Sequence, residues 1–414
     1  MTRGSAAGPH IKKSELRALT GLRAVAALAV VVSHTGIPKS APEPLVKLAA
    51  WGHIGVPLFF MLSGFVLAYN YADLTAGDRR RTVLFYVARV ARVMPLYWVM
   101  VAYCVAFYFA IGHVQYPGVL VQNIFAVQTW GSDVLAAQSR YNGPGWSIGV
   151  ELFFYALFPF VAPLVARFAN RFRLRGIALL VAAGAAISLS LWAWFVVTGR
   201  ADLPAADGQS AHRWLYRNPL PHLVEFVVGL ALAHALPYAR RWSARTHHLV
   251  QGGVVAYVLG LGMFHVVGSG PWSAGSFGPF FVLPFAVGML SLAADRGWLA
   301  RALSVRVMVS LGTASYALYL THRWFVWQLS TGDQIRTGEG LRPYVALVLT
   351  IAVLLVVAEG AHRYVETPAR TMLLRLSRSV VAWRDERAGL KRSGGGGVGR
   401  PEPTDDPEVL APTR

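Results

Sequence analysis

The chain has 414 residues, of which 55% are hydrophobic and only 14% are charged, and its formal net charge is +19. Soluble domains are seldom so poor in charge, and runs of about twenty apolar residues, each long enough to cross a hydrocarbon core of about 30 Å, recur along the chain. We therefore predict an all-α polytopic membrane protein. The runs lack the two-residue alternation of a β-barrel, and the arginines lie in short loops, which membrane topology explains better than nucleic-acid binding. The single cysteine, Cys104, excludes an internal disulfide and a cysteine-based metal cluster, and no metal is predicted.

Apolar length and breaker residues divide the chain into about ten predicted spans. In chain order they cover residues 16–36, 51–71, 84–111, 146–166, 176–198, 220–237, 249–267, 277–294, 308–330 and 343–365. With both termini in the cytoplasm, every inside segment contains at least three Lys or Arg, and most outside loops contain fewer. This bias favours a multi-pass protein of the cell (plasma) membrane with cytoplasmic ends.

Three regions follow from this division. Residues 1–15 are a cytoplasmic N-terminal segment, residues 16–370 are the membrane domain, and residues 371–414 are a basic and then disordered cytoplasmic tail. In the long outside loop, the apolar stretch 119–130 is too short to span and is predicted to lie at the membrane interface. Gly52, Gly55 and Gly64 in and near the second span are predicted to allow close helix packing.

The first span contains two residues that are costly in a membrane, Arg23 and His34. They are eleven residues apart, so at about 100° and 1.5 Å per residue they lie on one stripe of the helix, roughly 16 Å apart along its axis. A charge at bilayer depth costs on the order of 2.5–3.5 kcal/mol. The stripe is therefore predicted to face a polar interior.

The predicted topology sorts the other polar residues by depth. Arg89 and Arg92 begin the third span on one helix face, and with Arg23 they form an inner layer suited to a phosphate-bearing ligand from the cytosol. The alternative for these arginines is snorkelling to lipid headgroups. The predicted outer layer contains His34, Glu151 and His322, with His53 at the outer mouth.

A histidine in the outer layer can take a proton from a hydroxyl, and a carboxylate can orient it. The alternative for each outer residue is an ordinary interhelical hydrogen bond. Near Glu151, residues 145–149 match the G-x-S-x-G nucleophile elbow, but that motif needs a strand before its helix. We therefore predict that Ser147 caps or positions rather than forming an acyl-enzyme, and that Trp146 stacks on an acceptor sugar.

Six ordered pieces of sequence resemble acyltransferase family 3, the membrane enzymes that O-acylate sugars, polysaccharides and macrolides. They are Arg23-x10-His34, GVPLFFMLSGFVL at 55–67, the segment from Arg89 to Pro95, WSIGVELFFY at 146–155, SYALYLTH at 315–322 and YVETPAR at 364–370. The resemblance implies that His34 is catalytic, that Arg23, Arg89 and Arg92 serve the donor, and that the donor is an acyl-CoA, most often acetyl-CoA. This sequence departs from the family pattern at Leu152, where relatives usually have a second acidic residue.

The predicted reaction is direct transfer of an acyl group to a hydroxyl of a glycan, glycoside or macrolide-type acceptor. His34 acts as general base, with Glu151 and His322 holding the base or the acceptor, and no cofactor is bound. Two alternatives remain open at this stage: a transporter or flippase that uses the same Arg, His and Glu residues, and a membrane acyltransferase with a His and Asn pair. The sequence does not identify the acceptor, the acyl chain or the oligomeric state.

Overall fold

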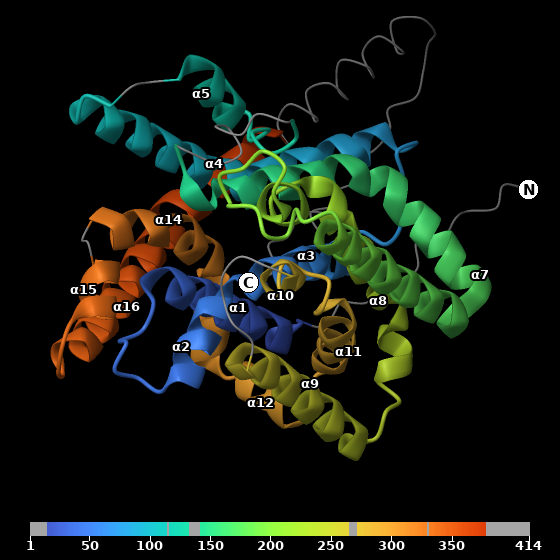
Figure 1. Ribbon diagram of the computed structural model, residues 1–414. Helices are drawn as coiled ribbons and strands as arrows, with labels where there is room; N and C mark the ends of the chain where they lie inside the picture. Colours follow the sequence, from blue (N-terminus) through green and yellow to red (C-terminus); the bar gives the residue numbers. More distant parts are fainter. Residues whose placement is uncertain (1–14, 114–115, 132–140, 265–270, 329–330, 378–414) are drawn as a thin grey trace, which may run out of the picture.

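The computed structural model describes residues 15–113, 116–131, 141–264, 271–328 and 331–377, and these are helical without any strand. Figure 1 shows the helices as one assembly, with α4 and α5 at one side and α14 to α16 beside α1 and α2. The main helices are α1 (Arg17–Thr35), α2 (Glu43–Ala50), α3 (Gly55–Asn70), α4 (Arg79–Ala110), α5 (Pro117–Ile124), α7 (Trp146–Val197), α8 (Pro219–Ala239), α9 (Ala244–Phe264), α10 (Pro271–Gly275), α11 (Val282–Ala293), α12 (Trp298–Leu303), α13 (Arg306–Thr313), α14 (Ser315–Gln328), α15 (Thr331–Thr337) and α16 (Arg342–Ala361).

Six described helical segments are long and apolar enough to cross a bilayer, which makes the chain a multi-pass α-helical membrane protein. They are Arg17–Thr35, Glu43–Asn70, Arg79–Ala110, Gly143–Val197, His212–Ala239 and Arg342–Ser377. The longest is not one straight rod, because Arg173 has a left-handed backbone (φ 51°) and divides α7 into two helices. The sequence predicted a break between the spans 146–166 and 176–198, and Arg173 lies within it. The first helix of α7 nevertheless continues beyond residue 166.

Three predicted spans are not among these six segments. The run 249–267 corresponds to α9, Ala244–Phe264. The apolar run 277–294 is helical as α11 only from Val282 to Ala293, and the run 308–330 is interrupted at Ala314 between α13 and α14. The sequence around that break, Gly312-Thr313-Ala314-Ser315, contains weak helix formers. Apolar length alone does not detect such an interruption.

Glycines set the closest helix contacts, as predicted. A Cβ on Gly64 of α3 would lie 2.1 Å from the carbonyl oxygen of Phe226 in α8, and one on Gly229 of α8 would lie 2.1 Å from that of Met61 in α3. The two backbones therefore touch through these reciprocal glycines. Gly52 packs in the same way on the backbone of α1, at Ala29.

The helix after the last predicted span is longer than expected. Beyond α16 the chain makes a π-turn (η4, His362–Glu366) and stays helical through residue 377. This helical segment, residues 362–377, belongs to the folded domain rather than to a loose tail. The predicted N-terminal segment and most of the predicted disordered tail lie outside the described residues.

Candidate active site

Two cavities lie along α1. The first, of about 360 Å³, is lined by His34 and is called here the histidine cavity. The second, of about 800 Å³, is lined by Arg23, Arg89 and Arg92 and is called the arginine cavity. Val56 and Tyr319 line both, so the two cavities adjoin. The predicted separation of Arg23 and His34 along one stripe of α1 is therefore confirmed.

His34 and His322 are in direct contact. Their rings are 4.9 Å apart between centroids, and the Nε2 atom of His322 is 3.2 Å from the Nδ1 atom of His34. They come from helices far apart in sequence, α1 and α14. The structure thus brings together two residues that the sequence could only assign to a common depth.

The backbone around the pair selects the tautomers. Nδ1 of His322 is 2.6 Å from the carbonyl oxygen of Tyr319, and Nδ1 of His34 is 2.9 Å from that of Val30. A carbonyl oxygen only accepts, so each Nδ1 carries the proton, and the single Nδ1–H of His34 is shared between the Val30 carbonyl oxygen and the Nε2 atom of His322. The lone pair of a neutral His34 is then on its Nε2, and no described residue hydrogen-bonds to that nitrogen.

Aromatic and basic residues form the rest of the histidine cavity. The wall includes Trp146, His53, His212, Tyr216, Arg217, Phe277 and Arg323. Trp146 lies here as predicted, and its ring is 4.7 Å from that of Tyr216. His53 also faces this cavity, but both of its ring nitrogens are engaged, with the Ala50 carbonyl oxygen at 3.1 Å and the Ser276 hydroxyl at 2.7 Å.

The arginine cavity brings together the three arginines assigned to the inner layer. Arg23 comes from α1, and Arg89 and Arg92 come from α4. Arg89 donates to the Tyr71 hydroxyl at 3.1 Å and its guanidinium carbon lies 5.3 Å from the centroid of the Tyr71 ring. All three side chains line this cavity, as expected for the inner layer.

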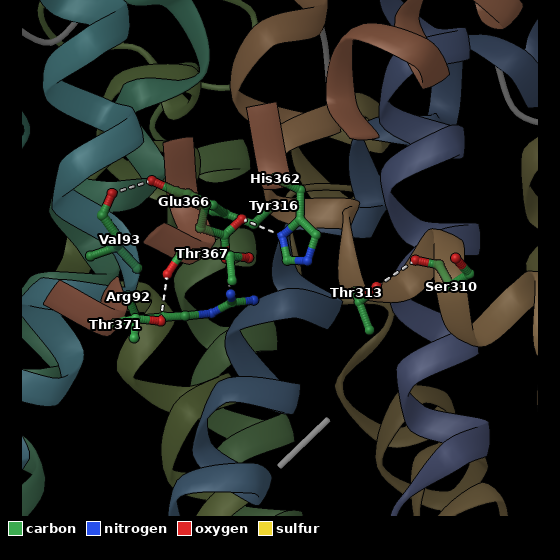
Figure 2. Close-up of polar contacts among 9 residues, drawn as sticks. All are labelled: Arg92, Val93, Ser310, Thr313, Tyr316, His362, Glu366, Thr367 and Thr371. Atoms are coloured by element: carbon green, nitrogen blue, oxygen red, sulfur yellow. Dashed lines mark hydrogen bonds and ion pairs between the residues drawn. The ribbon is translucent and has the colours of Figure 1, made fainter. Parts of the chain in front are cut away.

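Arg92 forms an ion pair that the sequence did not predict. Its guanidinium meets the buried carboxylate of Glu366, and the other oxygen of that carboxylate is 3.0 Å from Nδ1 of His362. Figure 2 shows the Glu366 carboxylate near both side chains, with Tyr316 alongside. The Tyr316 hydroxyl donates to the carbonyl oxygen of Val93, next to Arg92 on α4. These contacts attach segment 362–377 to α4.

Glu151 is not beside His34, and its predicted place in the outer layer is wrong. It lines the arginine cavity, accepts hydrogen bonds from Tyr155 and, at 3.5 Å, from Ser63, and interacts electrostatically with Arg23. Glu151 does lie near the start of α7, as its position along the predicted span indicated. Its carboxylate is on the Arg23 side of α7, where the attraction between opposite charges offsets part of the cost of placing both at depth.

Ser147 does not form a nucleophile elbow. Its hydroxyl donates to the carbonyl oxygen of Pro144 at 3.1 Å and interacts with Tyr319, and the chain enters α7 from a 3₁₀ turn at Gly143–Gly145 rather than from a strand. The predicted positioning hydroxyl fits this geometry. Ser147 and Tyr319 stand where the two cavities adjoin.

Sequence reasoning missed Tyr319, Arg323, Glu366 and Arg370 as cavity residues. Each one belongs to or directly follows a motif noted in the sequence, SYALYLTH or YVETPAR. The motifs thus contained the signal, but it could not be assigned to a cavity without the helix packing.

Comparison with known proteins identifies the family. A family model described as an acyltransferase domain (acyltransferase 3) matches residues 16–358. The chain belongs to acyltransferase family 3. The match covers α1 through most of α16, so it contains the histidine cavity and all of the arginine cavity except Glu15 and the wall formed by residues 362–375.

Individual relatives of the family are similar over most of this chain. Acyltransferase MdmB of Streptomyces mycarofaciens is 29% identical over 379 residues, which cover 86% of this chain and 92% of that protein. The putative peptidoglycan O-acetyltransferase YrhL of Bacillus subtilis is 26% identical over 88% of this chain, and O-acetyltransferase OatA of Staphylococcus aureus is 24% identical over 86%. The matched region is 57% of each of these two longer proteins. No solved structure matches the chain.

Proposed function

We propose that this acyltransferase moves an acyl group, most often acetyl, from acyl-CoA to a hydroxyl of a carbohydrate or macrolide-type acceptor, with His34 as the general base. The observation that carries the proposal is the contact between His34 and His322, which leaves the lone pair of His34 on Nε2 at a cavity wall. A neutral imidazole placed in this way is suited to take a hydroxyl proton, a contribution of roughly 10²–10⁴-fold to rate.

In this mechanism the acceptor lies in the histidine cavity and the nucleotide of acyl-CoA lies in the arginine cavity. The acceptor hydroxyl gives its proton to His34 Nε2 as its oxygen bonds to the thioester carbonyl carbon, and the C–S bond then breaks to release CoA thiolate. The thiolate takes up a proton, either from protonated His34 or from water. The pantetheine arm passes the shared wall at Val56 and Tyr319.

The sequence predicted that Glu151 holds the base or the acceptor, and its place in the structure leads us to propose a different role. Glu151 stands next to Arg23 and Tyr155 in the arginine cavity, so we assign it to balancing the Arg23 charge and holding that side chain toward the donor. The partner of the base is His322 instead. A carboxylate that orients a base must touch it.

The topology is part of the proposal. Ten spans with both ends in the cytoplasm place the arginine cavity toward the cytosol, where acyl-CoA is made, and the histidine cavity toward the outside of the plasma membrane. The acceptor would then be modified from the outer side. Aromatic walls such as Trp146, Tyr216 and Phe277 suit the faces of sugar rings or of a macrolide.

The direct test uses membranes that contain the protein, labelled acetyl-CoA and candidate glycoside or macrolide acceptors. We expect an O-acetylated product and an equal amount of free CoA from the wild type, and a loss of at least about 100-fold in kcat for His34→Ala. The control is His53→Gln, at the same cavity, whose ring already has both partners. A product that forms at the wild-type rate with His34→Ala would overturn the assignment of the base.

A transporter is the competing function for a protein with intramembrane Arg, His and Glu residues. It predicts substrate movement without any transfer of label from acetyl-CoA. The same membranes separate the two, since a transferase releases CoA in proportion to product and a transporter releases none. Membership in the acyltransferase family favours the transferase.

A further inference from the structure

One wall of the arginine cavity is the helical segment 362–377 that follows α16. The residues that line the cavity from this segment recur at helical spacing: His362, Glu366, Thr367, Arg370, Thr371, Leu374 and Arg375. Steps of three and four place them on one helix face. The face is therefore oriented into the cavity along most of its length, in a part of the chain predicted from sequence to end the domain.

The arginines of this cavity differ in whether a carboxylate balances them. Arg92 is paired with Glu366, and Arg23 interacts with Glu151. In the part of the chain that the structure describes, Arg89 and Arg370 form no ion pair with a carboxylate. Arg89 and Arg370 thus contribute positive charge to the cavity wall that no ion pair among the described residues balances.

Arg89 and Arg370 are also neighbours. They line the same cavity from α4 and from segment 362–377, and the Arg92–Glu366 ion pair, one helical turn from each of them, holds these two helices together. Arg89 also donates to the Tyr71 hydroxyl at 3.1 Å. Nε of Arg89 is buried without a hydrogen-bond partner. Two like charges held together at the wall of a cavity repel each other unless an anion lies between them.

A phosphate group is the anion that fits such a pair. Guanidinium groups bind phosphate through two parallel N–H···O bonds, and two of them approaching from different helices can hold one phosphate between them. The hydroxyls of Thr367 and Thr371 lie on the same helix face as Arg370 and line the same cavity. The Thr371 hydroxyl donates to the carbonyl oxygen of Thr367 at 2.8 Å, so the Thr367 hydroxyl is the neutral donor that this face offers beside Arg370.

We propose that Arg370, together with Arg89, forms a phosphate-binding clamp for the nucleotide of the acyl-CoA donor, so that segment 362–377 is part of the donor site. The inference rests on the proposed function, because it takes CoA as the donor. The phosphate is either the 3′-phosphate or the diphosphate of CoA, which share the same chemistry. Arg92, held by Glu366, orients this wall rather than supplying its unbalanced charge.

The test measures binding to the purified full-length protein in detergent, with CoA, dephospho-CoA and pantetheine as competing ligands for labelled acetyl-CoA. We expect Arg370→Gln to weaken CoA binding by about ten- to a hundredfold, the range for a lost charged hydrogen bond. Arg370→Lys, which keeps a point charge, is expected to lose less. Arg363→Gln is the matched control, because Arg363 is on the same segment but is exposed and stacks near Tyr364 rather than lining the cavity.

The ligands distinguish the two phosphates. If Arg370→Gln weakens the binding of CoA but not of dephospho-CoA, the clamp holds the 3′-phosphate. If it weakens the binding of both CoA and dephospho-CoA but not of pantetheine, the clamp holds the diphosphate. Unchanged CoA binding by Arg370→Gln, or an equal loss for pantetheine, would overturn the clamp while leaving the proposed function intact. If the wild type does not bind CoA, both the donor assignment and the clamp fail.

Discussion

Two histidines from distant helices define the chemistry at the scale of single residues. His34 faces the cavity, and His322 accepts from its Nδ1 while its own Nδ1 donates to a backbone carbonyl. In the proposed mechanism His322 acts through His34 and is a positioning residue. Its effect should be on the orientation and tautomer of the base rather than on donor affinity.

Replacing His322 by Leu removes the acceptor at 3.2 Å from His34 Nδ1. We expect kcat to fall by about ten- to a hundredfold, the usual cost of losing a group that orients a functional histidine, with KM for acetyl-CoA unchanged. His322→Gln, whose amide oxygen can accept the same hydrogen bond, should recover part of the loss. A wild-type kcat for His322→Leu would contradict the positioning role.

At the scale of helices, the Arg92–Glu366 ion pair attaches segment 362–377 to α4. Removing one partner of a buried pair typically costs about 3–5 kcal/mol, because the other charge is left unpaired. Glu366→Gln is therefore expected to lower the melting temperature of the purified protein. The double variant Arg92→Gln/Glu366→Gln should recover much of this stability, and a double variant less stable than both single ones would contradict the pairing.

The reciprocal glycines of α3 and α8 lead to a second prediction at this scale. A methyl group on Gly229 would overlap the Met61 carbonyl at 2.1 Å, so Gly229→Ala should destabilise the protein by about 1–3 kcal/mol or more, the cost of overpacking. The control is Gly253→Ala on α9, where a Cβ meets no atom within 4 Å. Thermal unfolding in detergent compares the two, and equal melting temperatures would show that the α3–α8 contact is loose.

At the scale of the whole molecule, the functional question is which side of the membrane each cavity faces. The proposed topology predicts that alkaline phosphatase fused within residues 200–210, after α7, is active outside, and that a fluorescent protein fused at the C-terminus folds inside. An inactive phosphatase at residues 200–210, or a C-terminal fluorescent protein that does not fold, would contradict this topology. The arginine cavity would then not face the cytosolic pool of acyl-CoA.

The sequence by itself was sufficient for the fold class, the α1 stripe and the family. Apolar length and the poverty in charge are local properties, and they predict membrane helices without any knowledge of contacts. The spacing of Arg23 and His34 fixes their places on one helix face, which the two cavities confirm. The ordered motifs predicted the family that the domain match identifies.

Only the tertiary structure decided which residues meet. Depth along a helix leaves its rotation open, so it grouped Glu151 with His34, whereas packing turns Glu151 toward Arg23. The same limit hid the His34–His322 contact, the Arg92–Glu366 ion pair and the place of Arg370 at the cavity wall, because these residues are more than two hundred positions from the residues they meet. A charge inside a membrane must find a partner, and which partner it finds depends on how the helices pack.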